Sequence, residues 1–259
     1  MQKSRMRTCL FLLFWLAVWQ TASFFIDNSI FLVGPLEVLK ALAAQLPTLR
    51  FWQTAGSSFL RIGGGFLLAF FAGIFLGALS FQCSFLRDLL SPLILTMKSV
   101  PVASFVILAL IWAGSKNLAV LISFIVVFPM IYSGTIDGLS STDSSLLEMA
   151  RVFHLPLLTK IFYLYRQALL PYLISACKTA MGLSFKSGIA AEVIGTPDYS
   201  IGERLYMAKI SLNTADLFAW TLVVILLCAL FERMIFFLLN LLNRCKTASD
   251  DCSVLPLKK

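Results

Sequence analysis

The sequence predicts an all-α polytopic membrane protein with six transmembrane helices and with both termini in the cytoplasm. Apolar residues make up 59% of its 259 residues, whereas typical globular proteins contain about 45–50%. Charged residues make up 13%, roughly half the usual share. Six apolar segments also come close to or exceed the length of about 20 residues that a helix needs to cross a bilayer. Little chain remains for a soluble domain, so we expect short loops around one helical membrane body.

The first apolar segment follows three basic residues, as the apolar core of a signal peptide would. Lys3, Arg5 and Arg7 precede the apolar residues 9–25. This run is longer than the roughly 7–15 residues typical of a signal peptide, so we expect an uncleaved first span. The other five predicted spans are residues 62–81, 89–112, 118–136, 169–194 and 217–241.

Basic residues near the span ends set the orientation, because cytoplasmic loops carry an excess of Lys and Arg. The basic N-terminus is therefore cytoplasmic, and six spans return the C-terminus to the same side. The tail and the loop between the fourth and fifth spans are basic as well, with Arg244, Lys246, Lys258, Lys259, Arg151, Lys160 and Arg166. Against this trend, the external side carries Lys40, Arg50, Lys116, Arg204 and Lys209. The net charge of +8 fits this asymmetry and anionic lipid head groups, and it does not indicate a nucleic-acid partner.

This topology divides the chain into three parts. Residues 1–47 hold an N-terminal cytoplasmic segment, the first span and an external loop. Residues 48–241 form the core, and residues 242–259 form a cytoplasmic tail. Within the external loop, Pro35 opens a helical pattern of apolar residues, which favours a helix that lies at the membrane surface.

The second and third spans contain features that shape helix packing. Gly73 and Gly77 have the GxxxG spacing that lets two helices approach closely. Pro92 and Pro101 interrupt the third span, with Lys98 between them. Broken helices are tolerated in a membrane beside protein or a water-filled cavity, and many mark transport paths. Two interpretations remain open for this break, a transport path and a kink that serves packing alone.

The loop between the fourth and fifth spans contains a predicted amphipathic helix. Ser145 and Glu148 have the spacing of a capping box, so we expect the helix to begin at Leu146. It would extend to about residue 155, before Pro156 ends it. The apolar face would comprise Leu146, Leu147, Ala150 and Phe153. A polar helix between two spans offers a docking place for a soluble partner; the alternative is a helix that rests on the lipid surface.

The fifth span opens at Pro171 and carries charged residues that a membrane rarely contains. Lys186 lies near its centre, where a lysine costs about 2.5–3.5 kcal/mol on insertion scales. Lys178 lies closer to the cytoplasmic end, toward which a long side chain can extend. Glu192 is six residues from Lys186, so the two side chains do not stack on one helix face. Lys186 either lines a pathway or pairs with a structural partner inside the bundle.

Several chemistries are missing from the sequence. The six cysteines are scattered without a CxxC pair, and there is one histidine, so we expect neither a disulfide nor a metal site. No GxxxxGK[ST] phosphate loop is present, so we do not expect the chain to hydrolyse ATP itself. No Ser–His–Asp set stands out, and we expect a protein that is not an enzyme and needs no cofactor.

Residues 148–171 resemble the cytoplasmic loop motif of the permeases of binding-protein-dependent ABC importers. The family pattern is Glu-Ala-Ala, three residues, glycine, nine residues and Ile-x-Leu-Pro, with a second proline four residues later. Glu148 and Ala150 match its opening, and Pro171 matches the second proline.

The pattern is not met at His154, Arg166 and Gln167. His154 stands where the family has glycine, which removes a position without a side chain from the end of the loop helix. Arg166 and Gln167 stand where Leu-Pro is expected. Under this resemblance, His154 or Arg166 would add contacts that are specific to one cognate ATPase.

The rest of the chain resembles the nitrate, sulfonate and taurine branch of this family, with its features in the same order. Residues 58–61 resemble the opening of the second helix, and residues 99–103 resemble the third. Residues 189–192 resemble the fifth helix, in which Phe185 replaces an aromatic residue that is often tryptophan. The resemblance covers residues 48–237.

The resemblance implies the fold of a type I ABC importer permease in a prokaryotic inner or plasma membrane. Two permease subunits, expected as a homodimer, would form the pathway. Two copies of a cytoplasmic ATP-binding subunit would dock on the loop helices, and an external solute-binding protein would deliver the solute. Glu148, Ala150 and Arg151 would lie in the ATPase groove, and His154 and Pro171 would belong to the same coupling region.

The resemblance also implies a small, anionic organic solute of the sulfonate, nitrate or taurine type. Candidate pathway residues are Lys98, Pro101, Phe185, Lys186 and Glu192. Lys98 and Lys186, doubled in a dimer, would offset the charge of an anion or pair with Glu192 inside the bundle. The alternatives are a thiamine-pyrimidine precursor or another heterocycle as the solute, and a stand-alone secondary transporter, which needs ion-coupling residues and often an internal repeat.

Overall fold

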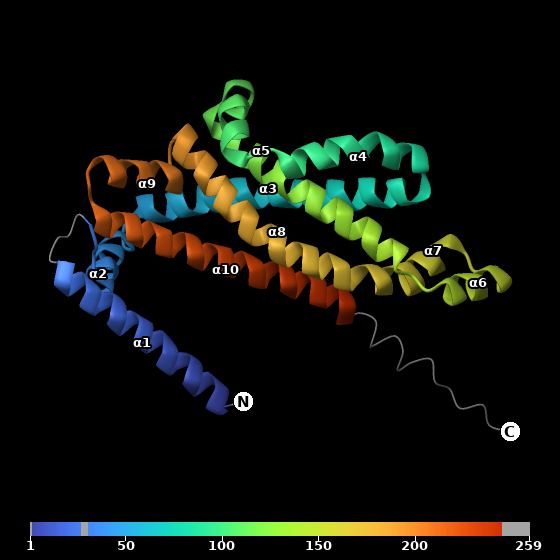
Figure 1. Ribbon diagram of the computed structural model, residues 1–259, viewed down its shortest axis with the longest axis horizontal. Coiled ribbons are helices and arrows are strands. Elements are labelled where there is room, and N and C mark those ends of the chain that lie inside the picture. Colours follow the sequence, from blue (N-terminus) through green and yellow to red (C-terminus); the bar gives the residue numbers. More distant parts are fainter. Residues whose placement is uncertain (1, 27–30, 245–259) are drawn as a thin grey trace.

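A computed structural model describes residues 2–26 and 31–244, and helices account for most of these residues. Four long helices run along the molecule in Figure 1: α3 (Leu49–Gln82), α5 (Val102–Ser140), α8 (Arg166–Gly195) and α10 (Thr214–Arg244). The cytoplasmic tail predicted from residue 242 onward lies almost wholly outside the described residues, with Lys246, Lys258, Lys259, Cys245 and Cys252.

Four stretches are long and apolar enough to cross a membrane: Leu49–Gln82, Val102–Ser140, Leu158–Gly195 and Thr214–Leu239. They confirm long apolar helices where the second, fourth, fifth and sixth spans were predicted. The helix α1 (Gln2–Ile26) covers the predicted first span, and its residues Leu13–Phe25 form a shorter apolar stretch.

The third predicted span, residues 89–112, is divided between two helices, and the break expected from its two prolines occurs at one of them. The helix α4 (Ser84–Ser99) ends before Val100 and Pro101, which both have extended backbone angles, and α5 begins directly afterwards. Proline pushes the residue before it out of the helical region, so the break falls at Val100 (φ −73°, ψ 127°). Pro92, in contrast, lies inside α4. A further kink inside α5 occurs at Gly114 (φ 68°, ψ 168°), in a region of backbone space that is essentially restricted to glycine.

The GxxxG pair brings α3 close to α5, as its spacing predicted. A Cβ atom placed on Gly73 would lie 2.9 Å from the Cβ of Ile131, and one on Gly77 would lie 2.8 Å from the Cβ of Thr135. Both distances are shorter than side-chain atoms tolerate, so the two helices approach along a surface that has no room for larger residues.

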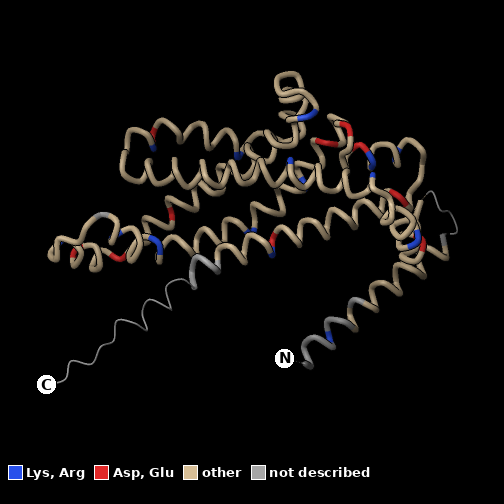
Figure 2. The backbone as a smooth tube through the Cα atoms, turned by 180° about the vertical axis from the view of Figure 1, so that it is seen from behind, with Lys and Arg blue, Asp and Glu red and all other residues tan. Residues whose placement is uncertain are grey.

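Small helices occupy the two ends of the bundle (Figure 1). The helices α2 (Pro35–Gln45) and α9 (Ile201–Ile210) lie at one end, and α6 (Ser144–Val152) and α7 (Leu157–Lys160) lie at the other. A helix therefore does begin at Pro35, as the sequence predicted. Figure 2 shows that most charged residues gather toward these two ends, as expected for a body that is apolar between them.

Candidate functional site

The predicted coupling helix is present, but it begins two residues earlier than expected. The N-cap of α6 is Asp143, whose side chain accepts a hydrogen bond of 2.9 Å from the backbone N–H of Ser145. Asp and Ser are comparable N-caps, so the capping box predicted from Ser145 was wrong because Asp143 takes that position first. The helix also ends at Val152 rather than near residue 155.

The end of α6 is a Schellman turn with His154 at its centre. The N–H of Leu155 donates to the carbonyl of Ala150 over 3.0 Å, and the N–H of His154 donates to the carbonyl of Arg151 over 3.1 Å. His154 has φ 48°, the left-handed conformation that this turn requires and that glycine usually supplies. The chain thus keeps the helix-to-turn geometry of a glycine position although it carries a histidine there.

The surface of α6 mixes apolar and charged side chains. Ala150 is fully buried, whereas Val152 and Phe153 are 73% and 71% exposed. Glu148 and Arg151 are exposed as well. The predicted apolar face is therefore not buried as a unit: Ala150 is buried and Leu147 is half-buried, whereas Leu146 and Phe153 are exposed. The rest of the helix projects from the end of the bundle (Figure 1).

The segment after α6 returns to the bundle through a widened helical turn. The π-helix η1 (Ile161–Tyr165) joins α7 to α8, and such turns often mark functional sites. Pro171 lies inside α8 rather than at the entrance of the span, which corrects the expectation for this residue. Arg166 opens α8, and its Nη2 atom is buried without a hydrogen-bond partner in the described part of the chain.

The candidate pathway residues next to the α4–α5 break are exposed. Lys98 lies in the last turn of α4, and its Nζ donates a hydrogen bond of 2.7 Å to Oγ of Ser133 in α5. Pro101, which precedes α5, is exposed as well. The break therefore holds a lysine at a helix C-terminus, a position that favours a cation.

The candidates on α8 have their contacts elsewhere. Phe185 is 2% exposed and packs against Phe231, with ring centroids 5.5 Å apart. Lys186 is exposed. It lies near Cys228 on α10, as Glu232 does. Phe185 is thus a core residue. Lys186 faces α10, whereas Lys98 contacts Ser133 of α5.

Glu192 is the centre of a buried polar cluster. It has no exposed surface, and its Oε2 accepts hydrogen bonds from Oγ of Ser58 (2.6 Å) and from the N–H of Gly202 (3.3 Å). Its Oε1 lies 3.7 Å from a guanidinium nitrogen of Arg61. Ser58 also accepts a 2.9 Å bond from the N–H of Ile201. The cluster therefore joins α3 and α8 and satisfies the first backbone donors of α9.

This cluster corrects one alternative and reveals residues that the sequence analysis left without a role. The ion-pair partner of Glu192 is Arg61, not a lysine. Ser58 and Arg61 are three residues apart, which places them on one face of α3. A buried carboxylate needs a cation and hydrogen-bond donors. The spacing of Ser58 and Arg61 could therefore have indicated them as the partners of Glu192.

Comparison with known proteins gives the family. A family model described as "Binding-protein-dependent transport system inner membrane component" matches residues 69–244. The nitrate import permease protein NrtB of Leptolyngbya laminosa is 30% identical over 145 residues, which cover 56% of this chain and 52% of that protein. The bicarbonate transport system permease protein CmpB of Synechococcus elongatus is 28% identical over 153 residues, or 59% of this chain and 55% of the relative.

Similarity to a further relative covers more of both chains. The nitrate import permease protein NrtB of Synechococcus elongatus is 26% identical over 190 residues, which are 69% of this chain and 68% of that protein. The matches to the first two relatives span only about half of their length. The family and the long apolar helices together confirm the expected multi-pass location in a prokaryotic cell membrane. Because the family model matches well over half of the chain, this protein belongs to the inner-membrane components of binding-protein-dependent transport systems.

Proposed function

We propose that this chain is the membrane-spanning subunit of an ABC importer and that a cytoplasmic ATPase docks on α6. The observation that carries this proposal is the mixed surface of α6 at the end of the bundle. Val152 and Phe153 expose apolar surface beside the charged Glu148 and Arg151. Exposed apolar residues rimmed by polar ones are typical of protein interaction sites.

The docked ATPase would act on the membrane helices through the turn that follows α6. Only four residues separate the end of α6 at Val152 from the start of α7 at Leu157, and the chain then continues through η1 into α8. A displacement of α6 during ATP binding would therefore reach a membrane-spanning helix over a short and largely helical path. This segment contains His154, Arg166 and Pro171, which would affect how rigidly it connects α6 to α8.

The solute proposed for this transporter is a small oxyanion. Two of the relatives are named for the import of nitrate and one for the transport of bicarbonate. Lys98 at the α4–α5 break supplies a positive charge on an exposed face of the chain. Two permease subunits, as a homodimer, would place two such lysines around one pathway, and an external solute-binding protein would deliver the anion. A sulfonate or taurine remains a larger member of the same anionic class.

Reversal of one charge on α6 tests this function. Glu148→Arg should abolish co-purification of the ATPase subunit and ATP-dependent uptake of labelled nitrate into proteoliposomes. Glu37→Arg is the matched control, because Glu37 is exposed on α2 at the other end of the bundle. Unchanged uptake in Glu148→Arg would contradict docking on α6, and uptake by the chain alone without ATP would indicate a secondary transporter.

A further inference from the structure

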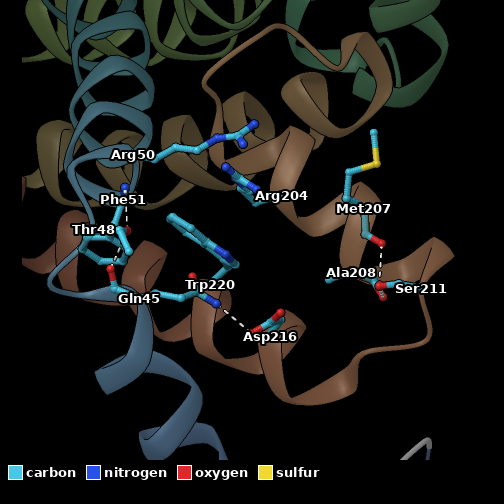
Figure 3. A pocket seen from close by; sticks show the side chains of 10 residues that line it. All are labelled: Gln45, Thr48, Arg50, Phe51, Arg204, Met207, Ala208, Ser211, Asp216 and Trp220. Carbon is cyan, nitrogen blue, oxygen red and sulfur yellow. Dashed lines mark hydrogen bonds between the residues drawn. The ribbon is translucent and has the colours of Figure 1, made fainter.

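A polar cavity lies at the end of the bundle opposite α6. Its volume is about 380 Å³, within the range of small-ligand pockets. Side chains from α2, the start of α3, α9 and the start of α10 line it (Figure 3). The cavity involves none of the coupling or pathway residues discussed above, so its chemistry is separate from the proposed docking surface.

Two arginines give this cavity its charge. Arg50 lies in the first turn of α3 and Arg204 lies on α9, and Figure 3 shows their guanidinium groups close together on one side of the cavity. Within the described residues, neither arginine forms an ion pair. Two like charges that face one another repel, and an anion bound between them would relieve that repulsion. The planar donor fork of arginine fits an oxyanion in particular.

The acidic residue in the cavity offsets only one of the two positive charges. Oδ1 of Asp216 accepts a 2.7 Å hydrogen bond from Nε2 of Gln45, and Oδ2 accepts a 2.8 Å bond from Nδ2 of Asn213. Both carboxylate oxygens are thus engaged with amide groups. With two guanidinium groups and one carboxylate among the lining residues, the cavity keeps an excess positive charge.

The rest of the wall favours an anion at the same position. Arg50 is the second residue of α3, so its backbone N–H is one of the helix donors that have no acceptor inside the helix. The positive end of the α3 dipole also points into this region. Trp220 is 4% exposed and packs against Phe51, with ring centroids 5.1 Å apart, which gives the cavity a rigid apolar wall.

We propose that this cavity binds an oxyanion between Arg50 and Arg204. The oxyanion belongs either to a small inorganic anion in solution or to the phosphate of a phospholipid head group at the membrane surface. The site does not depend on which solute the transporter moves. Binding would clamp α3 to α9, which are joined on their inner side by the Glu192 cluster.

Thermal unfolding of the full chain, purified with its partner subunits and stripped of lipid in a neutral detergent, tests the site. Inorganic phosphate, nitrate and bicarbonate are added at constant ionic strength, with chloride as the comparison. We expect an oxyanion to raise the unfolding midpoint by about 2–4 °C and the double variant Arg50→Gln/Arg204→Gln to lose this rise. Arg87→Gln/Arg233→Gln removes two exposed arginines outside the cavity and should keep it.

A second measurement identifies a phospholipid as the source of the oxyanion. Native mass spectrometry of the same complex counts phospholipids that remain bound, and we expect the cavity variant to retain fewer than the control variant if a head group is the ligand.

The pair Arg50→Lys/Arg204→Lys keeps the charge but loses the planar fork, and should bind the oxyanion more weakly than wild type. The proposal is overturned if neither soluble oxyanions nor phospholipids distinguish the wild-type protein from Arg50→Gln/Arg204→Gln.

Discussion

Glu192 in α8 accepts a hydrogen bond of 2.6 Å from the hydroxyl of Ser58 in α3, at a position where Glu192 has no exposed surface. A buried carboxylate is stable only when charges and donors compensate it, and here Arg61 and the N–H of Gly202 complete the set. The side chain of Glu192 therefore connects α3, α8 and α9.

Loss of the Ser58 hydroxyl should destabilise the protein measurably. Ser58→Ala removes a donor to Glu192 and the acceptor of the Ile201 N–H, so we expect a loss of about 1–3 kcal/mol for the buried groups left unsatisfied. The measurement is the thermal unfolding midpoint of the purified chain in detergent. Ser57→Ala, one residue away, is not a neutral control because the Ser57 hydroxyl bonds to backbone carbonyls; the exposed Ser91→Ala in α4 is a better one. A midpoint equal to wild type in Ser58→Ala would contradict the structural role of the cluster.

Gly202 should tolerate no side chain. A Cβ atom at this position would lie 2.3 Å from the backbone carbonyl carbon of Glu192, so Gly202→Ala forces α9 away from α8. Gly56→Ala is the matched control: its Cβ would meet no atom within 4 Å, and alanine in a helix is favoured over glycine by about 0.5–1 kcal/mol. We expect Gly202→Ala to lower the unfolding midpoint and Gly56→Ala to leave it equal or higher. Equal midpoints in both variants would mean that α9 does not pack on α8 in this way.

The apolar pattern of the sequence predicted most of the long helices because a membrane span depends on local composition. The third predicted span contains a break, and its cause is local as well. Pro101 acts on the residue before it, so the helix ended at Ser99 instead of bending through the proline. The left-handed position at Gly114 then kinked α5. Neither the length nor the hydropathy of a segment carries this information.

The candidate site was predicted less completely, since its partners are distant in the sequence. Glu192 and Ser58 are separated by 134 residues, and an apolar pattern does not report which helix faces which. The start of α6 was predicted to within two residues because a polar, helix-forming segment between apolar spans is a local signal, although its cap is Asp143 and not Ser145. The left-handed conformation of His154 could be anticipated only from the glycine that the family pattern has at that place.

Replacement of His154 by glycine should stabilise the end of α6. The left-handed backbone at φ 48° costs a residue with a Cβ about 1 kcal/mol relative to glycine. His154→Gly should therefore slow hydrogen exchange of the N–H groups of His154 and Leu155, which close the turn. His154→Val should accelerate this exchange, because a β-branched residue fits the left-handed region poorly. Faster exchange in His154→Gly would show that the imidazole itself holds the turn.

Lys98 and Lys186 should differ in their effects on transport. Lys98 lies beside the α4–α5 break and contacts Ser133, so loss of its charge should weaken attraction of an anion to the pathway. We expect Lys98→Gln to raise the KM for nitrate uptake about three- to tenfold, which corresponds to about 0.7–1.4 kcal/mol, and Lys98→Arg to restore most of the affinity.

Lys186 lies exposed on α8 near Cys228 of α10, so we expect Lys186→Gln to leave the KM near that of wild type. Uptake by ATP-driven proteoliposomes over a series of nitrate concentrations separates KM from the maximal rate. Lys116→Gln, which removes an exposed lysine from α5, controls for a general effect of charge. A raised KM in Lys186→Gln with an unchanged KM in Lys98→Gln would contradict the role of Lys98 and would assign the attraction of the anion to Lys186 on α8.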